Sequence, residues 1–103
     1  MSFDSLIARA MRIGVDEIAY PIDVFATATE IAEHPQAAEN FDKLLGLVED
    51  KENYFTRWAA IRAISQMGPE FIDRARNTLE RQSKVEDYEL ALEEINSAIA
   101  KIA

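Results

Sequence analysis

A period of 34 residues is the strongest constraint in this chain. Its three tyrosines, Tyr20, Tyr54 and Tyr88, stand 34 residues apart, and so do Pro35 and Pro69. A fixed period of this size is typical of stacked supersecondary units, none of which can bury its apolar face alone. The sequence therefore predicts a single domain, 1–103, built from three similar units. These units are residues 1–34, 35–68 and 69–103.

Each unit has room for two helices. The 103 residues include only three glycines and three prolines, which leaves little material for long loops. Apolar side chains recur at helical spacing in every unit, and Pro35 and Pro69 break the chain after His34 and Gly68. The predicted fold class is all-α, with six helices paired into three helical hairpins. The expected helices are 3–13, 21–33, 36–49, 53–67, 69–82 and 86–102.

The helix expected at 53–67 differs from the others. Its apolar residues lie on nearly every side, which is typical of a helix that is buried all round. We therefore expect it at the centre of the stack. Gly46, inside the preceding helix, destabilises that helix by about 1 kcal/mol relative to alanine. We interpret it as a point where a neighbouring helix approaches closely.

Residues 50–68 resemble a HEAT-like repeat, in which an acidic loop precedes a hydrophobe, an arginine and a second helix rich in alanine and leucine that ends at glycine. The residues with these roles are Asp50, Phe55, Arg57, Ala59, Ala60, Ala63, Ile64 and Gly68. The pattern departs from the family at Thr56, which separates the hydrophobe from the arginine. The outer units keep acidic loops, at 16–17 and 86–87, but not the arginine.

This resemblance implies an α-solenoid whose second helices line a concave, partner-binding face. It also implies that Asp50 and Arg57 belong to a polar ladder that ties repeats together. Because Asp23 occupies the same position of its unit as Arg57, we expect these two side chains to approach each other across units one and two. The tetratricopeptide repeat also has 34 residues and is the alternative fold, but its tryptophan, leucine and glycine before the tyrosine are missing here.

Composition and charge exclude several classes of function. The net charge of −8 would repel a nucleic-acid backbone, and the 11 basic residues are dispersed along the chain. No apolar run approaches the roughly 20 residues that span a bilayer, and no basic stretch followed by an apolar one opens the chain. We therefore expect a cytoplasmic protein that binds neither nucleic acid nor membrane. Without cysteine, the chain has no disulfide or thiolate site.

Candidates for catalysis or metal binding are few. His34 is the only histidine, and at a helix end a partly charged imidazole interacts favourably with the helix dipole. We therefore expect a structural role for it. The sequence contains no glycine-flanked serine elbow, no phosphate-binding glycine loop and no calcium-binding loop. We predict no catalytic residue, no metal and no cofactor.

Two groups of side chains on the second helices are candidates for binding a partner. Phe25, Phe55 and Arg62 combine aromatic rings with a guanidinium group, which is typical of contact hot spots. Glu86, Glu89 and Glu93 are like charges three and four residues apart on one face of the last helix, an arrangement that destabilises a helix slightly and would suit a basic partner. Glu89 and Glu93 are the predicted contact residues of this set. The alternative for the phenylalanines is a place in the core, and the alternative for the carboxylates is a plain solvated face.

The sequence thus predicts a non-enzymatic protein-interaction module that binds a peptide or protein surface combining an apolar anchor with basic residues. One alternative is an acidic inhibitor or immunity-type protein that covers a basic enzyme through Glu89 and Glu93. Another is an enzyme, because HEAT-like repeats also occur in chromophore lyases and DNA-base excision proteins. Mildly apolar ends, with Phe3 and Leu6 at one and Leu90 at the other, make a homodimer an alternative to the monomer.

Overall fold

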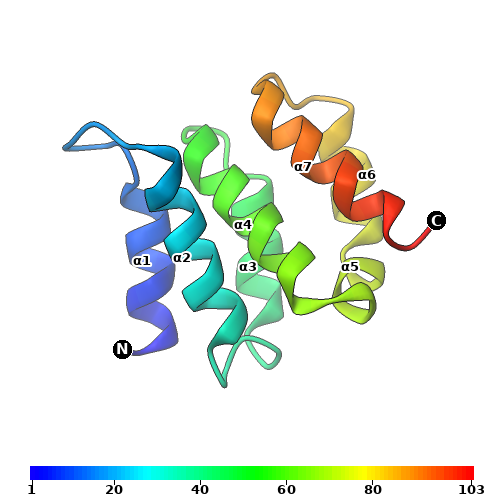
Figure 1. Ribbon diagram of the computed structural model, residues 1–103, viewed down its shortest axis with the longest axis horizontal. Coiled ribbons are helices and arrows are strands. Elements are labelled where there is room, and N and C mark those ends of the chain that lie inside the picture. The colour runs from blue at the N-terminus through cyan, green and yellow to red at the C-terminus, as the bar shows by residue number, and fades with distance from the viewer.

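The computed structural model describes residues 1–103 and is all-helical (Figure 1). Its seven helices are α1 (Phe3–Arg12), α2 (Pro21–Glu33), α3 (Phe41–Val48), α4 (Tyr54–Met67), α5 (Pro69–Arg74), α6 (Arg76–Ser83) and α7 (Glu89–Ala100). Helices α1, α3 and α6 run in one direction, and α2, α4 and α7 run in the other (Figure 1). The segments 13–20, 49–53 and 84–88 therefore lie at the same end of the molecule. No helix has the length and apolar composition that crossing a membrane requires.

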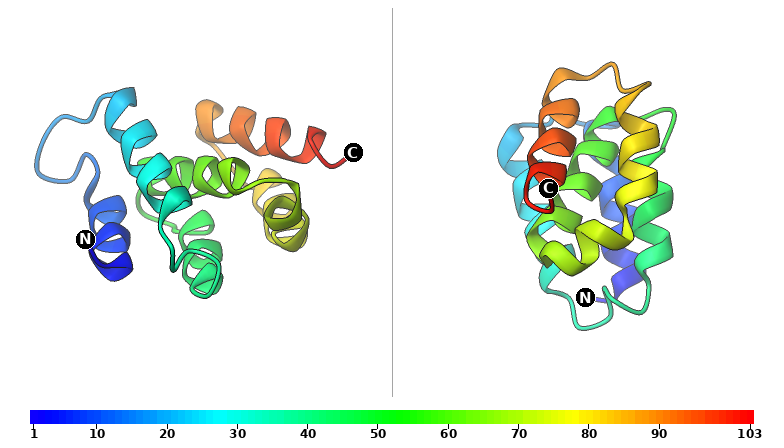
Figure 2. Two further views of the ribbon diagram at one scale, coloured as in Figure 1. Left: turned by 60° about the horizontal axis from the view of Figure 1, so that its bottom comes forward. Right: turned by 90° about the vertical axis from the view of Figure 1, so that its right-hand side faces the viewer.

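The helices form two layers around α4. Helices α2, α4 and α7 make up one layer, and α1, α3 and α6 make up the other (Figure 2). Helix α4 packs against α2 and α7 within its own layer and against α1, α3 and α5 outside it. Its residues from Thr56 to Ser65 are all buried except Arg62. The prediction that this helix is buried on every side is confirmed.

Polar side chains on α4 have partners in other helices. The hydroxyl of Thr56 donates to the carbonyl of Ala10 in α1 at 2.7 Å. The hydroxyl of Ser65 accepts from the ammonium group of Lys101, just past α7, at 2.7 Å. Buried polar groups are strongly destabilising when they lack such partners. These contacts therefore fix α4 along its axis relative to α1 and α7.

The start of α4 is also tied to the end of α1. The side-chain oxygen of Asn53 accepts from the backbone N–H of Phe55 at 2.9 Å, while its amide nitrogen donates to the carbonyl of Ile13 at 3.0 Å. Gly14 follows with a φ of 76°, in the left-handed region that favours glycine. A Cβ atom at Gly14 would lie 2.8 Å from the ring of Phe55. The segment after α1 thus passes directly against the first turn of α4.

Three details of the predicted helices are wrong. The helix expected at 69–82 is two helices, because the backbone tightens at Ala75, whose N–H donates to the carbonyls of both Phe71 and Ile72. The chain therefore has seven helices instead of six. The helix expected at 36–49 begins only at Phe41, after a run of turns. The last helix begins at Glu89, because the residues before it make contacts outside the helix, described below.

The interpretation of Gly46 is also wrong. A Cβ atom at this position would meet no heavy atom within 4 Å, and the residue is exposed. No neighbouring helix approaches α3 there. Glycine at this site lowers helix stability without a packing reason visible in the structure.

Truncating the centre of α4 should strongly destabilise the fold. Ile61 is fully buried, and the Ile61→Ala substitution should lower the free energy of unfolding by roughly 2–5 kcal/mol, because it removes apolar contacts and leaves a cavity. The exposed Ile22 in α2 provides the matched control, and Ile22→Ala should change the stability by less than about 0.5 kcal/mol. Urea unfolding followed by circular dichroism measures both. Equal effects of the two substitutions would contradict the central position of α4.

Candidate protein-interaction face

Five aromatic side chains form a continuous row over the layer of α2, α4 and α7. We call Phe25, Tyr54, Phe55, Trp58 and Tyr88 the aromatic row. The centroid distances between neighbouring rings are 5.4 Å from Phe25 to Trp58, 5.8 Å from Trp58 to Tyr88, 4.2 Å from Tyr88 to Tyr54 and 4.5 Å from Tyr54 to Phe55. Ring pairs in this range attract each other beyond their simple burial. The row therefore joins the first turn of α4 to α2 and to the start of α7.

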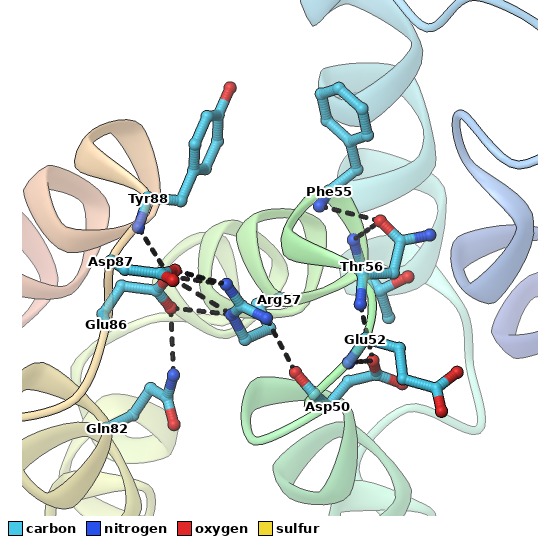
Figure 3. A network of polar contacts seen from close by, with 10 residues as sticks. Asp50, Glu52, Phe55, Thr56, Arg57, Gln82, Glu86, Asp87 and Tyr88 are labelled. Carbon is cyan, nitrogen blue, oxygen red and sulfur yellow. Dashed lines mark hydrogen bonds and ion pairs between the residues drawn. The ribbon is translucent and has the colours of Figure 1, made fainter.

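The tyrosines of the row leave polar groups available to a ligand. Tyr54 is 42% exposed, and Tyr88 is half-buried. Figure 3 shows the ring of Tyr88 pointing away from the polar network at its base, with the hydroxyl at the tip. Neither phenol hydroxyl hydrogen-bonds to another residue of the chain. Burial, and then the neighbouring Tyr54, raise the pKa of Tyr88, so its hydroxyl stays protonated near pH 7 and can donate.

Arg62 is positioned at the far end of the row. Its guanidinium carbon lies 4.1 Å from the centroid of the Phe25 ring, and its Nη1 donates to Glu94 at 3.0 Å. Glu94 also accepts from the indole N–H of Trp58 at 3.2 Å. The Arg62 side chain is 32% exposed, and its Nη2 has no partner in the chain. A guanidinium group held between a ring and a carboxylate loses little freedom when it donates to a ligand.

The two predicted phenylalanines are neither purely contact residues nor purely core residues. Phe25 and Phe55 are half-buried and pack against the hydrophobic core while part of each remains at the surface. Phe25 lies under Arg62, and Phe55 lies between Gly14 and Tyr88. Each ring therefore supports the fold on one side and contributes to the face on the other.

The predicted acidic set is divided in the structure and is separate from the aromatic row. Glu86 precedes α7 and is buried in an ion pair with Arg57, so the expectation that it belongs to an exposed acidic face is wrong. Glu89 and Glu93 are exposed on α7, and neither forms an ion pair or a side-chain hydrogen bond within the chain. Their neighbour Glu94 is turned toward Trp58 and Arg62 instead. The structure thus brings Phe25 and Arg62 into contact but joins neither of them to Glu89 or Glu93.

A buried ion pair beneath the row holds α4 to the segment before α7 (Figure 3). The Nε and Nη2 atoms of Arg57 donate to the two carboxylate oxygens of Glu86, each at 2.9 Å, and Nη1 donates to the carbonyl of Asp50 at 2.9 Å. The side chain of Glu86 has no exposed surface and also accepts from Gln82 at 3.0 Å and from the backbone N–H of Tyr88 at 3.1 Å. Such fork-to-carboxylate geometry is strong and direction-specific. The last of these bonds fixes the backbone that carries the Tyr88 ring.

The predicted contact between Asp23 and Arg57 is wrong. The carboxylate of Asp23 accepts from the backbone N–H of Tyr20 at 2.8 Å and so stabilises the start of its own helix. Arg57 turns instead to Glu86 in the segment before α7. It also donates to the backbone carbonyl of Asp50, while the expectation that these two residues form a ladder between repeats stays a prediction.

His34 has structural contacts at the opposite end of the molecule. Its Nδ1 accepts from the backbone N–H of Gln36 at 3.0 Å, its Nε2 lies 3.0 Å from the carbonyl of Met1, and its ring meets Phe3 edge-on. These contacts hold the N-terminus against the turn after α2. No group of three or more His, Asp or Glu side chains is arranged to hold a metal ion.

Four residues of the face were not among the predicted contact residues. Three of them, Tyr54, Trp58 and Tyr88, belong to the aromatic row. The fourth, Glu94, accepts hydrogen bonds from Trp58 and Arg62 and so positions Arg62. The 34-residue period contained a signal for two of them, because a stack of repeats would place Tyr54 and Tyr88 side by side. Their ring centroids are 4.2 Å apart, with the ring planes tilted by 36°. Nothing in the period indicated the contact of Glu94 with Trp58.

Comparison with models of protein families, with curated proteins and with solved structures finds no match for this chain. The geometry of the aromatic row and its neighbours is therefore the basis for a proposed function.

The ion pair should make stability depend on pH. Burial alone would raise the pKa of Glu86, but the hydrogen bonds from Arg57, Gln82 and the Tyr88 N–H outweigh it and hold that pKa below its usual value of 4.5. Because the folded-state pKa is lowered, the stabilisation is fully present above about pH 4.5 and is lost as the pH falls through the folded-state value. Glu86→Gln should lower stability at pH 7 by roughly 3 kcal/mol.

The difference in free energy of unfolding between the native chain and Glu86→Gln should then shrink as the pH is lowered from 5 toward 3, since glutamine cannot titrate. Urea unfolding of both proteins across this range measures it. The exposed and unpaired Glu93 gives the control, and Glu93→Gln should remain within about 0.5 kcal/mol of the native chain at pH 7. A difference for Glu86→Gln that stays constant down to pH 3 would contradict the assigned role of the ion pair.

Proposed function

We propose that this chain is a non-enzymatic protein-interaction module whose partner binds the layer of α2, α4 and α7 at the aromatic row. In this proposal the chain is a HEAT-like α-solenoid of three hairpins. Helices α2, α4 and α7 are the second helices of its units, with α5 and α6 together forming the first helix of unit three. The layered packing of α1, α3 and α6 behind them supports this assignment (Figure 2).

The observation that supports the binding role best is the pair of neighbouring tyrosine rings in the row, one exposed and one half-buried. The rings of Tyr54 and Tyr88 are 4.2 Å apart, Tyr54 is 42% exposed, and neither hydroxyl is used within the chain. Rigid aromatic rings with a free polar tip are enriched where proteins bind other proteins, because they bury a large area and lose little conformational entropy. The row therefore provides apolar contact together with hydrogen bonding.

Arg62 adds a directional contact to this surface. Its unpaired Nη2 faces no acceptor in the chain, while Phe25 and Glu94 hold the rest of the group in place. A backbone carbonyl of an extended or helical partner segment is a suitable acceptor, because it needs no full opposite charge. The partner in this proposal places an apolar side chain on the tyrosines and a carbonyl on Arg62.

A second candidate function uses the other predicted residues. Glu89 and Glu93 are exposed and have no cation of their own, which suits an acidic inhibitor that covers a basic enzyme. Binding of that kind would be abolished by Glu89→Lys together with Glu93→Lys and would be unaffected by changes to Arg62. Binding at the aromatic row would instead depend on Arg62.

The two arginines that stack on rings provide a matched test. Arg62 lies over Phe25 at 4.1 Å, and Arg74 of α5 lies over Phe41 at 4.8 Å in a different part of the molecule. Peptides selected from a random display library on the immobilised native chain are measured by fluorescence anisotropy against Arg62→Ala and Arg74→Ala. We expect Arg62→Ala to weaken binding by about 30-fold, the loss of a hot-spot contact of about 2 kcal/mol. Arg74→Ala should change it less than about twofold.

Circular dichroism and thermal unfolding are used to check that both variants remain folded. Equal weakening by both substitutions would contradict the proposed site, because it would indicate a general effect on the fold. Failure of the library to yield any peptide with saturable binding would contradict the interaction function itself.

A further inference from the structure

Exposed apolar side chains are concentrated at one end of the molecule. Of the nine large hydrophobic residues that are exposed, eight lie in the segments 13–20, 49–53 and 84–88 or in the helical turn that adjoins them, and the ninth is Met1. We call this region the loop end. It includes Ile18 at 80% exposure, Val85 at 71% and Ile22 at 66%, together with Val15, Tyr20 and Tyr54. The opposite end, formed by 33–40 and the start of α5, has only Met1, which lies beside His34.

The three segments of the loop end form one connected surface. One cavity lies between Gly14, Val15 and the start of α4, and it is lined also by Asp50, Glu52 and Tyr54. A second cavity shares those three residues and continues to Val85 and Asp87. Tyr54, which lines both cavities, is also part of the aromatic row. A ligand in either cavity would therefore contact the aromatic row at Tyr54.

The charge of the loop end determines which ligand fits. The residues 13–20, 49–53 and 84–89 contain eight carboxylates and two lysines. Three of the carboxylates are paired with arginines, namely Asp16 with Arg12, Glu49 with Arg81 and Glu86 with Arg57. When these arginines are counted as well, the surface still carries a net charge of −3. Glu52 and Glu89 have no cation of their own, and Asp87 shares its cation with Glu86.

We propose that the loop end binds a cationic amphipathic protein segment, with apolar side chains on Ile18, Ile22 and Val85 and with lysine or arginine beside Glu52, Asp87 and Glu89. This inference rests on the proposed interaction function and adds the chemistry of the partner. Exposed apolar area of this kind is covered by a partner when the protein is at work. A second copy of the chain, with its charge of −8, and a phosphate-bearing surface are both repelled by these carboxylates.

The test uses three synthetic 16-residue peptides that share one amphipathic pattern of leucine. The polar positions are lysine in the first peptide, glutamine in the second and glutamate in the third. Binding to the full chain is followed by fluorescence anisotropy at 50 mM and 500 mM NaCl. We expect the lysine peptide to bind at least tenfold more tightly than the glutamine peptide at 50 mM and to lose most of this advantage at 500 mM, because salt screens exposed charges. The glutamate peptide should not bind.

Matched charge reversals locate the binding surface. The triple variant Glu52→Lys, Asp87→Lys, Glu89→Lys should weaken binding of the lysine peptide at least tenfold. The control variant Glu39→Lys, Asp42→Lys, Glu70→Lys changes the net charge equally at exposed positions of the opposite end, and it should weaken binding less than threefold. A third variant, Ile18→Ser, Ile22→Ser, Val85→Ser, should weaken binding of the lysine and glutamine peptides alike. These nine side chains are exposed, so the variants should remain folded, which thermal unfolding checks.

Several outcomes would overturn the inference and leave the proposed function standing. Equal binding of the lysine and glutamine peptides would mean that charge plays no part. Binding that is lost in Arg62→Ala but not in the loop-end variants would place the partner on the aromatic row alone. A concentration-dependent dimer, or binding to phosphatidylcholine vesicles, that is abolished by the three serine substitutions would show that a second copy or a lipid covers this end. If the lysine peptide does not bind while library-selected peptides do, the inference is wrong and the interaction function remains.

Discussion

The burial of α4 on all sides is the constraint on which the rest of the structure depends. The fully buried polar side chains of such a helix cannot reach water, so they need partners on neighbouring elements. Arg62, on the partly exposed side of α4, keeps contact with solvent. Thr56 reaches α1, Arg57 reaches the segment before α7, and Ser65 meets Lys101. Because these partners lie on different elements, each bond fixes the register of one neighbour. The apolar contacts give most of the stability, and the polar contacts determine how the helices are aligned.

The same alignment forms the aromatic row and the loop end, the two surfaces that we propose to bind a partner. With α1, α3 and α6 running against α2, α4 and α7 (Figure 1), three connecting segments meet at one end. Arg57 and Glu86 hold the last of them, and the Tyr88 N–H donates to the same carboxylate. The Tyr88 ring is thereby placed on Tyr54. The buried ion pair between Arg57 and Glu86 thus has two effects. It holds the segment before α7 to α4, and it positions the Tyr88 ring of the aromatic row.

Sequence reasoning predicted the helical class, the position of α2 and α4 and the all-round burial of α4, because these follow from composition and from the spacing of apolar residues. It did not predict the partner of Arg57 or the break at Ala75. Both depend on which of several nearby groups a side chain or an N–H reaches, and residue spacing does not contain that information. The spacing of the tyrosines predicted a repeat, and the contact between the Tyr54 and Tyr88 rings is compatible with it. The role of Glu94 could not be predicted, because the sequence does not show which of the carboxylates Glu89, Glu93 and Glu94 turns toward Trp58.

Hydrogen exchange of the backbone amides, measured on the chain alone and with a library-selected peptide, tests the binding surface most directly. For the chain alone, we predict that the slowest exchange lies in α4, whose opening requires global unfolding. With the peptide, we predict added protection confined to residues 13–25, 52–62 and 84–94. Added protection at 33–40 or along α3 and α6, with none at the start of α4, would contradict the assignment of this face.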